Sequence, residues 1–261
     1  MSIAADALGM EWVKFRTVRS TYWTLLFAVV ATIGIGALVC VVHINRFNHL
    51  SPGDRLEFDA VRFSLAGVQL AQLAIGVLGV LVMTNEYTTG VIRATFAAVP
   101  QRRAVLAAKA LVFALAVFVV GEIASFSAFF VGQSILAGKN LDVHIGDPGV
   151  LRAVFGGGLY LTVLGLFALG LGSLVRHTAG AIATFFGLLL VLPGIVAALP
   201  QSWQDAIEKW LPVNAGEAIF RHGHQFGTGH SLGPWTGLGV FCAYAAAALL
   251  AAGFLLGRRD A

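Results

Sequence analysis

Charged residues are scarce in this 261-residue chain, and their scarcity sets the first limit on its fold. They make up 11% of the residues, whereas hydrophobic residues make up 58%. A soluble domain usually carries about 25% charged residues. A soluble fold of this length cannot bury so much apolar surface in one core, so lipid is the expected surrounding. The formal net charge of +4 is small and scattered, which argues against nucleic acid as a partner.

Cysteines and catalytic signatures are nearly as scarce. Cys40 and Cys242 both sit inside apolar runs, which favours small buried hydrophobic residues over a disulfide framework. The chain contains no GxxxxGK[ST] phosphate loop, no GxSxG nucleophile elbow and no HExxH metal helix. We therefore expect a chain that is not an enzyme, binds no cofactor or metal itself and does not hydrolyse ATP.

Six long apolar stretches are present instead. A helix that crosses a bilayer needs about 20 mostly apolar residues. The stretches cover residues 22–42, 64–83, 104–136, 150–174, 179–199 and 236–256. The sequence therefore predicts an all-α, multi-pass membrane protein with six transmembrane helices in one domain, residues 1–261.

The basic residues indicate how these helices are oriented. An even number of spans places both termini on one side of the membrane, and basic residues favour the cytoplasmic side. Ten of the 17 basic residues fall on the side of the termini and seven on the other side. The ten are Lys14, Arg16, Arg19, Arg93, Arg102, Arg103, Lys109, Arg176, Arg258 and Arg259. We therefore expect both termini in the cytoplasm, with the chain in the plasma membrane.

The segment before the first span, residues 8–21, has the pattern of an interfacial helix. At helical spacing Trp12 and Phe15 share one face, while Lys14 lies away from it. Trp12 suits the depth of the lipid headgroups, and the neighbouring Lys14 and Arg16 suit the membrane surface. The alternative is a charged topology anchor with no further role.

Residues 85–103 lie between the second and third spans and are too polar to cross the membrane. They predict a short helix from Glu86 to about Ala98, which ends before Pro100. Apolar residues fall on more than one side of this helix, which favours contact with both the membrane and a partner protein. The alternative is a helix that only lies on lipid.

Two polar residues inside the predicted spans are candidates for lining a transport route. Glu122 is the only ionisable residue deep within a span, where a charge is costly unless it faces a cavity or a partner. The alternative is a carboxyl near the end of an over-long helix, or one that stays protonated. Gln133 is the second candidate, although a hydrogen bond between helices also explains it.

The segment before the last span, residues 200–235, is the longest connection. Its aromatic and apolar residues from Trp203 to Phe220 predict two short helices at the membrane interface. His222, His224 and His230 follow in a Gly-rich stretch. Their spacing is a weak metal signature without a cysteine, so we expect no metal there.

Three segments carry a resemblance to a known family. They are residues 11–26 (EWVKFRTVRSTYWTLL), residues 85–109 (NEYTTGVIRATFAAVPQRRAVLAAK) and residues 211–219 (LPVNAGEAI). Their order and spacing, with the six spans, resemble the permease subunit of type-2 ATP-binding-cassette (ABC) exporters, particularly the small stand-alone permeases of high-GC bacteria. The resemblance covers nearly the whole chain.

The resemblance implies a mechanism and a set of partners. The permease would pair with a second permease copy, identical or related, and with separate ATPase subunits that bind ATP and Mg. Residues 203–220 would be re-entrant helices on the outer side. The cytoplasmic coupling helix would contact the ATPase through Glu86, Tyr87, Gly90, Arg93 and Phe96. Two other functions remain open: a membrane-embedded scaffold or immunity protein, and an intramembrane enzyme acting on lipids or peptides.

Overall fold

The chain folds into helices throughout the part that the structure, a computed structural model, describes. The described residues are 3–47, 58–98, 101–222 and 231–258, and the side chains of residues 3–7, 15, 93, 94, 96 and 98 are not described. No β-strand occurs within these ranges. The predicted all-α class is confirmed. Away from its end turns a helix satisfies its backbone hydrogen bonds within the segment, which is what a chain surrounded by lipid requires.

Six helices in the described ranges are long and apolar enough to cross a membrane. The chain is therefore a multi-pass membrane protein, as predicted. The helices are α2 (Arg19–Arg46), α5 (Val68–Thr88), α7 (Arg102–Leu136), α8 (Val150–Val175), the broken helix Thr178–Ala197, and α13 (Pro234–Arg258).

The second predicted span, residues 64–83, was placed too early. Its first residue, Ser64, belongs to a separate short helix, α4 (Ala60–Ser64), and α5 starts only at Val68. The side chain of Asp59 begins α4 by accepting hydrogen bonds from the backbone of Val61 and Arg62. Hydropathy averaged over about 20 residues does not register such a break, because the break depends on a local cap and turn.

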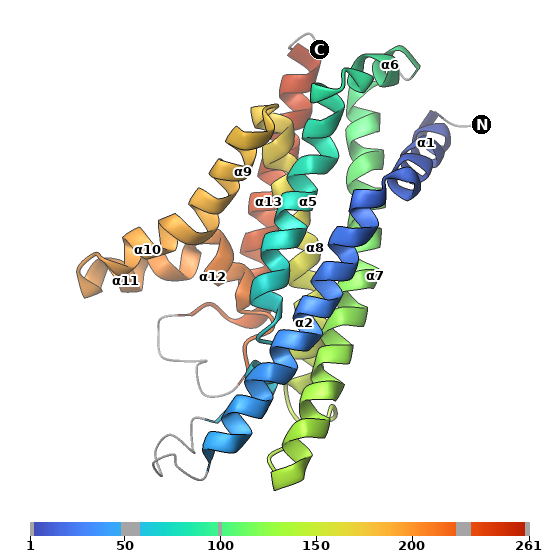
Figure 1. Cartoon of the computed structure of the whole chain (residues 1–261). Helices are drawn as coiled ribbons and strands as arrows, with labels where there is room; N and C mark the ends of the chain where they lie inside the picture. The colour runs from blue at the N-terminus through green and yellow to red at the C-terminus, as the bar shows by residue number, and fades with distance from the viewer. Residues whose placement is uncertain (1–2, 48–57, 99–100, 223–230, 259–261) are drawn as a thin grey trace.

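Helix α8 forms the centre of the bundle, packed against α5, α7 and α13 (Figure 1). Small residues bring α5 and α8 close together. A Cβ atom added at Gly79 would lie 2.5 Å from the backbone oxygen of Gly165, and one added at Gly172 would lie 2.9 Å from that of Val80. Close backbone approach of this kind is how helices associate in lipid, where no hydrophobic force drives them together.

The fifth span is not one regular helix. It consists of α9 (Thr178–Phe186), a π-helical turn η3 (Gly187–Val191) and α10 (Leu192–Ala197). Pro193 explains the irregular turn, because a proline has no N–H for the helix hydrogen bond of the preceding turn.

Two short helices follow α10, as the sequence predicted. They are α11 (Gln201–Ile207) and α12 (Pro212–Glu217), with a 3₁₀ turn, η4 (Glu208–Trp210), between them. Both overlap the predicted stretch from Trp203 to Phe220. The second begins at Pro212, which suits the first turn of a helix. These helices extend to one side of the bundle, about halfway along its length (Figure 1).

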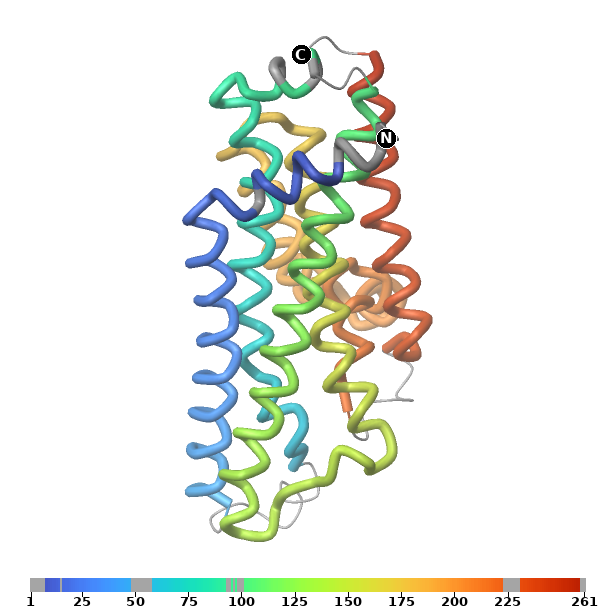
Figure 2. Tube along the Cα trace, turned by 90° about the vertical axis from the view of Figure 1, so that its right-hand side faces the viewer, coloured from blue at the N-terminus to red at the C-terminus, as the bar shows by residue number. Residues whose placement is uncertain are grey.

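Both ends of the described chain lie at the same end of the bundle, together with α1 (Ile3–Thr17) and α6 (Val91–Ala98) (Figures 1 and 2). The predicted continuous helix from Glu86 to Ala98 is wrong. Helix α5 continues to Thr88, and Gly90 then turns the chain with a φ of +73°, a conformation that glycine adopts without strain. Glu86 therefore belongs to α5, and only the residues from Val91 onward form α6.

Candidate functional site

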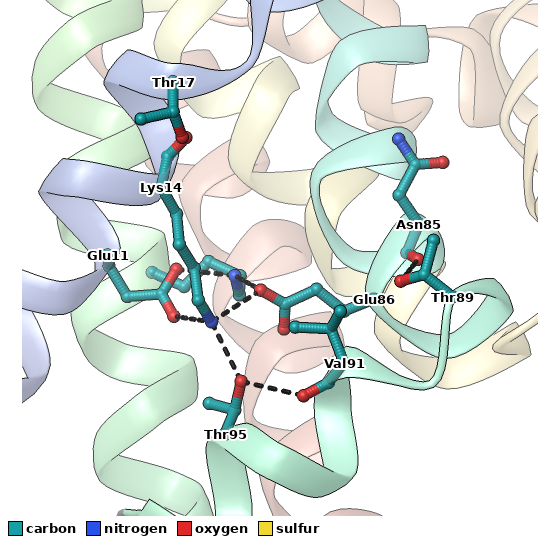
Figure 3. Close-up of polar contacts among 9 residues, drawn as sticks. Glu11, Lys14, Thr17, Asn85, Glu86, Thr89, Val91 and Thr95 are labelled. Carbon is teal, nitrogen blue, oxygen red and sulfur yellow. Dashed lines mark hydrogen bonds and ion pairs between the residues drawn. The ribbon is translucent and has the colours of Figure 1, made fainter.

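Four charged side chains form an ion cluster where α1, α5 and α7 meet (Figure 3). Lys109 Nζ on α7 lies 2.6 Å from Glu11 Oε2 on α1 and 2.8 Å from Glu86 Oε1 on α5. Lys14 Nζ lies 3.1 Å from Glu11 Oε1 and 3.0 Å from Glu86 Oε1. Two ammonium groups thus balance two carboxylates. We call these four residues, Glu11, Lys14, Glu86 and Lys109, the ion cluster.

The ion cluster also reaches α6. Lys14 donates a third hydrogen bond, 2.9 Å long, to Oγ1 of Thr95 on α6, and this hydroxyl in turn donates to the backbone oxygen of Val91. All three N–H bonds of the Lys14 ammonium are therefore used. A single side chain from α1 connects the end of α5 with α6.

Burial makes the ion cluster strong and sensitive to change. Glu11 is 3% exposed and Lys109 is 4% exposed. Burial alone would lower the pKa of Lys14, but the hydrogen bond to Glu86 and the negative charges of Glu11 and Glu86 raise it above the usual 10.5. Lys14 is therefore positively charged at neutral pH, as the charge balance requires.

The turn between α5 and α6 differs from the ion cluster below it, because it is open to the surroundings. Thr88, Thr89, Gly90 and Val91 are all exposed, and Val91 is a large apolar residue that is 45% exposed. The protein thus presents a free tip whose base is held by buried ion pairs.

The structure brings together some of the residues predicted for this region and separates others. Glu86 and Lys14 meet in the ion cluster, although Lys14 was expected at the membrane surface and points into the protein. Tyr87 lies under the guanidinium of Arg176, 5.2 Å from its ring centroid. Gly90 forms the exposed turn. The side chains of Arg93 and Phe96 lie outside those that the structure describes.

The interfacial-helix residues stay a prediction for the same region. Helix α1 exists, Trp12 is 45% exposed on its outer side, and Arg16 is exposed as well. The side chain of Phe15 is not described. The inward face of α1 is polar, because Glu11 and Lys14 lie on it. The pattern of apolar residues did not indicate this.

Sequence reasoning missed three members of the site: Glu11, Lys109 and Thr95. The spacing of Glu11 and Lys14, three residues apart, indicated only a local pair. Lys109 was interpreted as a basic residue that sets topology. Nothing in the sequence indicated that it would pair with residues 98 and 23 positions away.

Glu122 on α7 faces the backbone of α8. A Cβ atom added at Gly158 would lie 2.5 Å from the carboxyl carbon of Glu122. Both carboxyl oxygens are buried and have no hydrogen-bond partner among the described residues. The role of Glu122 in lining a route stays a prediction.

We expect the variant Glu122→Met to be more stable than the wild type by about 1–3 kcal/mol, since it removes two buried acceptors that lack a hydrogen bond. Thermal unfolding of the purified protein in detergent measures this difference. Glu122→Gln is the matched control, because it keeps polar atoms at the same place and should gain less. A Glu122→Met protein that unfolds earlier than the wild type would show that the carboxyl has a stabilising partner.

Gln133, the other candidate for a route, is occupied by structural contacts. Its Nε2 donates to Ser64 Oγ at 3.0 Å, and its Oε1 accepts from the backbone of Val143 at 2.8 Å. It therefore connects α7 to α4 and to the segment that precedes α8. It lies about three turns along α7 from Glu122, so the two side chains do not form one site.

A second polar network anchors α12 to the bundle, about halfway along its length (Figure 1). The hydroxyl of Tyr160 donates to Gln72, Gln72 donates to Gln69, and Gln69 Nε2 donates to Glu217 Oε1 at 3.0 Å. Arg221 holds the other oxygen of Glu217 at 2.9 Å. Every hydrogen bond in this network is donated toward the Glu217 carboxylate. The network therefore fixes the position of α12.

The histidines do not assemble a metal centre in the part of the chain that the structure describes. His222 contacts Asp59 at 3.5 Å and the backbone oxygen of Pro148 at 3.3 Å. His224 and His230 lie outside the described residues. Within those ranges no group of three or more His, Cys, Asp or Glu residues is arranged to hold a metal ion.

Comparison of the sequence with known proteins assigns no family to this chain. The chain matches no protein-family model, and no curated protein shows significant similarity to it. The assignment of function therefore depends on the geometry of the described residues and on the resemblance of the three sequence segments.

Proposed function

We propose that this chain is the membrane-spanning subunit of an ATP-driven exporter of the type-2 ABC class. It would work with a second permease copy and with separate ATPase subunits that bind ATP and Mg. The observation that carries the proposal is the exposed turn between α5 and α6, whose base is fixed by the ion cluster to α1 and α7.

This arrangement suits a surface at which a conformational change of a partner protein is transmitted to the membrane helices. Residues 88–91 are free to contact another protein, and Val91 offers an apolar side chain for it. A displacement of α6 acts on Lys14 through Thr95, and Lys14 is joined to Glu86 on α5. Lys109 extends the same connection to α7. Motion of the tip would therefore move three helices together rather than α6 alone.

The orientation that we propose follows the distribution of charge. Arg102, Arg103 and Arg258 lie on helices that start or end at the same end of the bundle as α1 and α6. Basic residues favour the cytoplasmic side, so we place both termini in the cytoplasm of a bacterial plasma membrane. An ATPase that docks on α6 must meet it there, so docking tests the orientation as well.

We expect Gly90→Asp to abolish binding of the partner ATPase, while Gly90→Asn retains it. No atom lies within 4 Å of a Cβ atom at Gly90, and both aspartate and asparagine tolerate its positive φ, so the two variants differ essentially in one charge. A new carboxylate inside a desolvated contact costs binding energy. Co-purification of a candidate ABC-type ATPase subunit with the chain, together with its ATP hydrolysis, gives the measurement.

Two results would contradict the proposal. Equal recovery of the ATPase with both Gly90 variants would show that the turn between α5 and α6 is not its docking site. Failure of the wild-type chain to bind or stimulate any ABC-type ATPase would favour the scaffold or immunity function instead.

A further inference from the structure

A partly open cavity of about 310 Å³ lies beside the ion cluster and is lined by residues of α1, α2, α5, α6 and α7. Its floor is apolar and is formed by Leu78, Leu81, Val82 and Val112. Most of the other lining residues are polar, and they include Ser20, Thr21 and Thr24 in the first turns of α2. Ligand sites in proteins have volumes of about 300–1,000 Å³ and this same division between apolar walls and a few polar groups.

The polar part of the cavity has the features of an anion site. Helix α2 has 28 residues, and its N-cap residue Val18 supplies no side-chain hydrogen bond to the free N–H groups of the first turn. Thr21 also lines the cavity. The residue is 4% exposed, and no hydrogen bond joins its hydroxyl to another described residue. The hydroxyl is therefore available to donate to a ligand group in the cavity.

Charge favours an anion at this place as well. Glu11 and Glu86 would repel an anion, but Lys14 and Lys109 neutralise them within the ion cluster. Two further cations, Arg16 and Arg19, stand exposed on either side of the joint between α1 and α2. Neither arginine forms an ion pair with a described residue. The remaining field at the start of α2 is therefore positive.

We propose that this cavity binds an anionic phospholipid from the membrane leaflet on the side of the termini. The phosphate lies at the start of α2, against Thr21 and the free backbone N–H groups. One acyl chain lies between α2 and α5 on Leu78, Leu81 and Val82. A lipid is the occupant, rather than a free anion, because the apolar floor gives the hydrocarbon chain a place that inorganic phosphate leaves empty. This proposal is independent of any ATPase partner.

Native mass spectrometry of the purified chain with added lipid tests the proposal. We expect one phosphatidylglycerol per chain, bound about 30-fold more tightly than phosphatidylcholine, because each of two arginines contributes about 1 kcal/mol toward an anionic lipid. The double variant Arg16→Gln, Arg19→Gln should lose this preference. Equal binding of the two lipids by the wild type would overturn the proposal.

Two matched pairs of variants test the position of the lipid. Thr21→Val should weaken lipid binding several-fold, whereas Thr24→Val should not, because Thr24 lines the same cavity but already donates to the backbone of Ser20. Leu81→Trp fills the floor and should abolish binding, whereas Leu38→Trp, on an exposed part of α2, should not. Wild-type binding by either Thr21→Val or Leu81→Trp would refute the assigned position.

Inorganic phosphate and dodecyl phosphate distinguish the two sources of a phosphate group. Dodecyl phosphate carries a hydrocarbon chain and should displace the bound lipid at concentrations where inorganic phosphate does not. Displacement by both at the same concentration would show a free-anion site and overturn the assignment to lipid.

Discussion

Replacement of Lys109 by methionine is expected to destabilise the protein by about 3–5 kcal/mol, since it leaves a buried negative charge without its partner. Lys109 is 4% exposed and contacts both carboxylates of the ion cluster, at 2.6 and 2.8 Å. After the change, Lys14 alone faces Glu11 and Glu86. Thermal unfolding of the purified protein in detergent, followed by size-exclusion chromatography, measures the loss.

The double variant Glu11→Gln, Lys109→Met is the control for this prediction. It removes one charge of each sign, so the remaining pair of Lys14 and Glu86 is balanced again. We expect it to recover a large part of the stability lost by Lys109→Met alone. If both variants unfold at the same temperature, the two side chains do not interact, and the ion cluster does not hold α1 against α7.

The second large effect is expected at Gly36 on α2. A Cβ atom at this position would lie 2.2 Å from the backbone oxygen of Ser64, closer than any real contact of this kind. Gly36→Ala therefore forces α2 away from α4, which we expect to cost about 3 kcal/mol or more. The measurement is the same thermal unfolding experiment, together with the yield of folded protein.

Gly34 provides a close control two residues away on the same helix. No atom lies within 4 Å of a Cβ atom at Gly34, and the residue is exposed. Alanine has the higher helix propensity, so Gly34→Ala should be neutral or stabilising by up to about 1 kcal/mol. Equal stability of the two alanine variants would mean that α2 and α4 are not in close contact.

The sequence predicted the long helices better than it predicted the residues of the candidate site. The apolar stretches predicted the six long helices, because hydrophobicity over about 20 residues is a local property of the chain. The boundaries failed where one residue changes the backbone, as at Gly90, or where a short helix such as α4 precedes a span. Those features depend on local turns and caps that an average over a window does not resolve.

Composition and the spacing of apolar residues by themselves determined the class of this protein. A chain with 58% hydrophobic residues is surrounded by lipid, and lipid offers no hydrogen bonds to an open backbone, so helices follow from the sequence alone.

Only the tertiary structure decided which charges meet. Glu11, Lys14, Glu86 and Lys109 come from three helices, and their pairing depends on the angle and depth at which α1 packs on α7. The same holds for the cavity beside Thr21, whose walls come from five helices. In the sequence each charged residue alone indicates only membrane topology. The energy of an ion pair depends on the distance between two side chains in space, which no local sequence pattern contains.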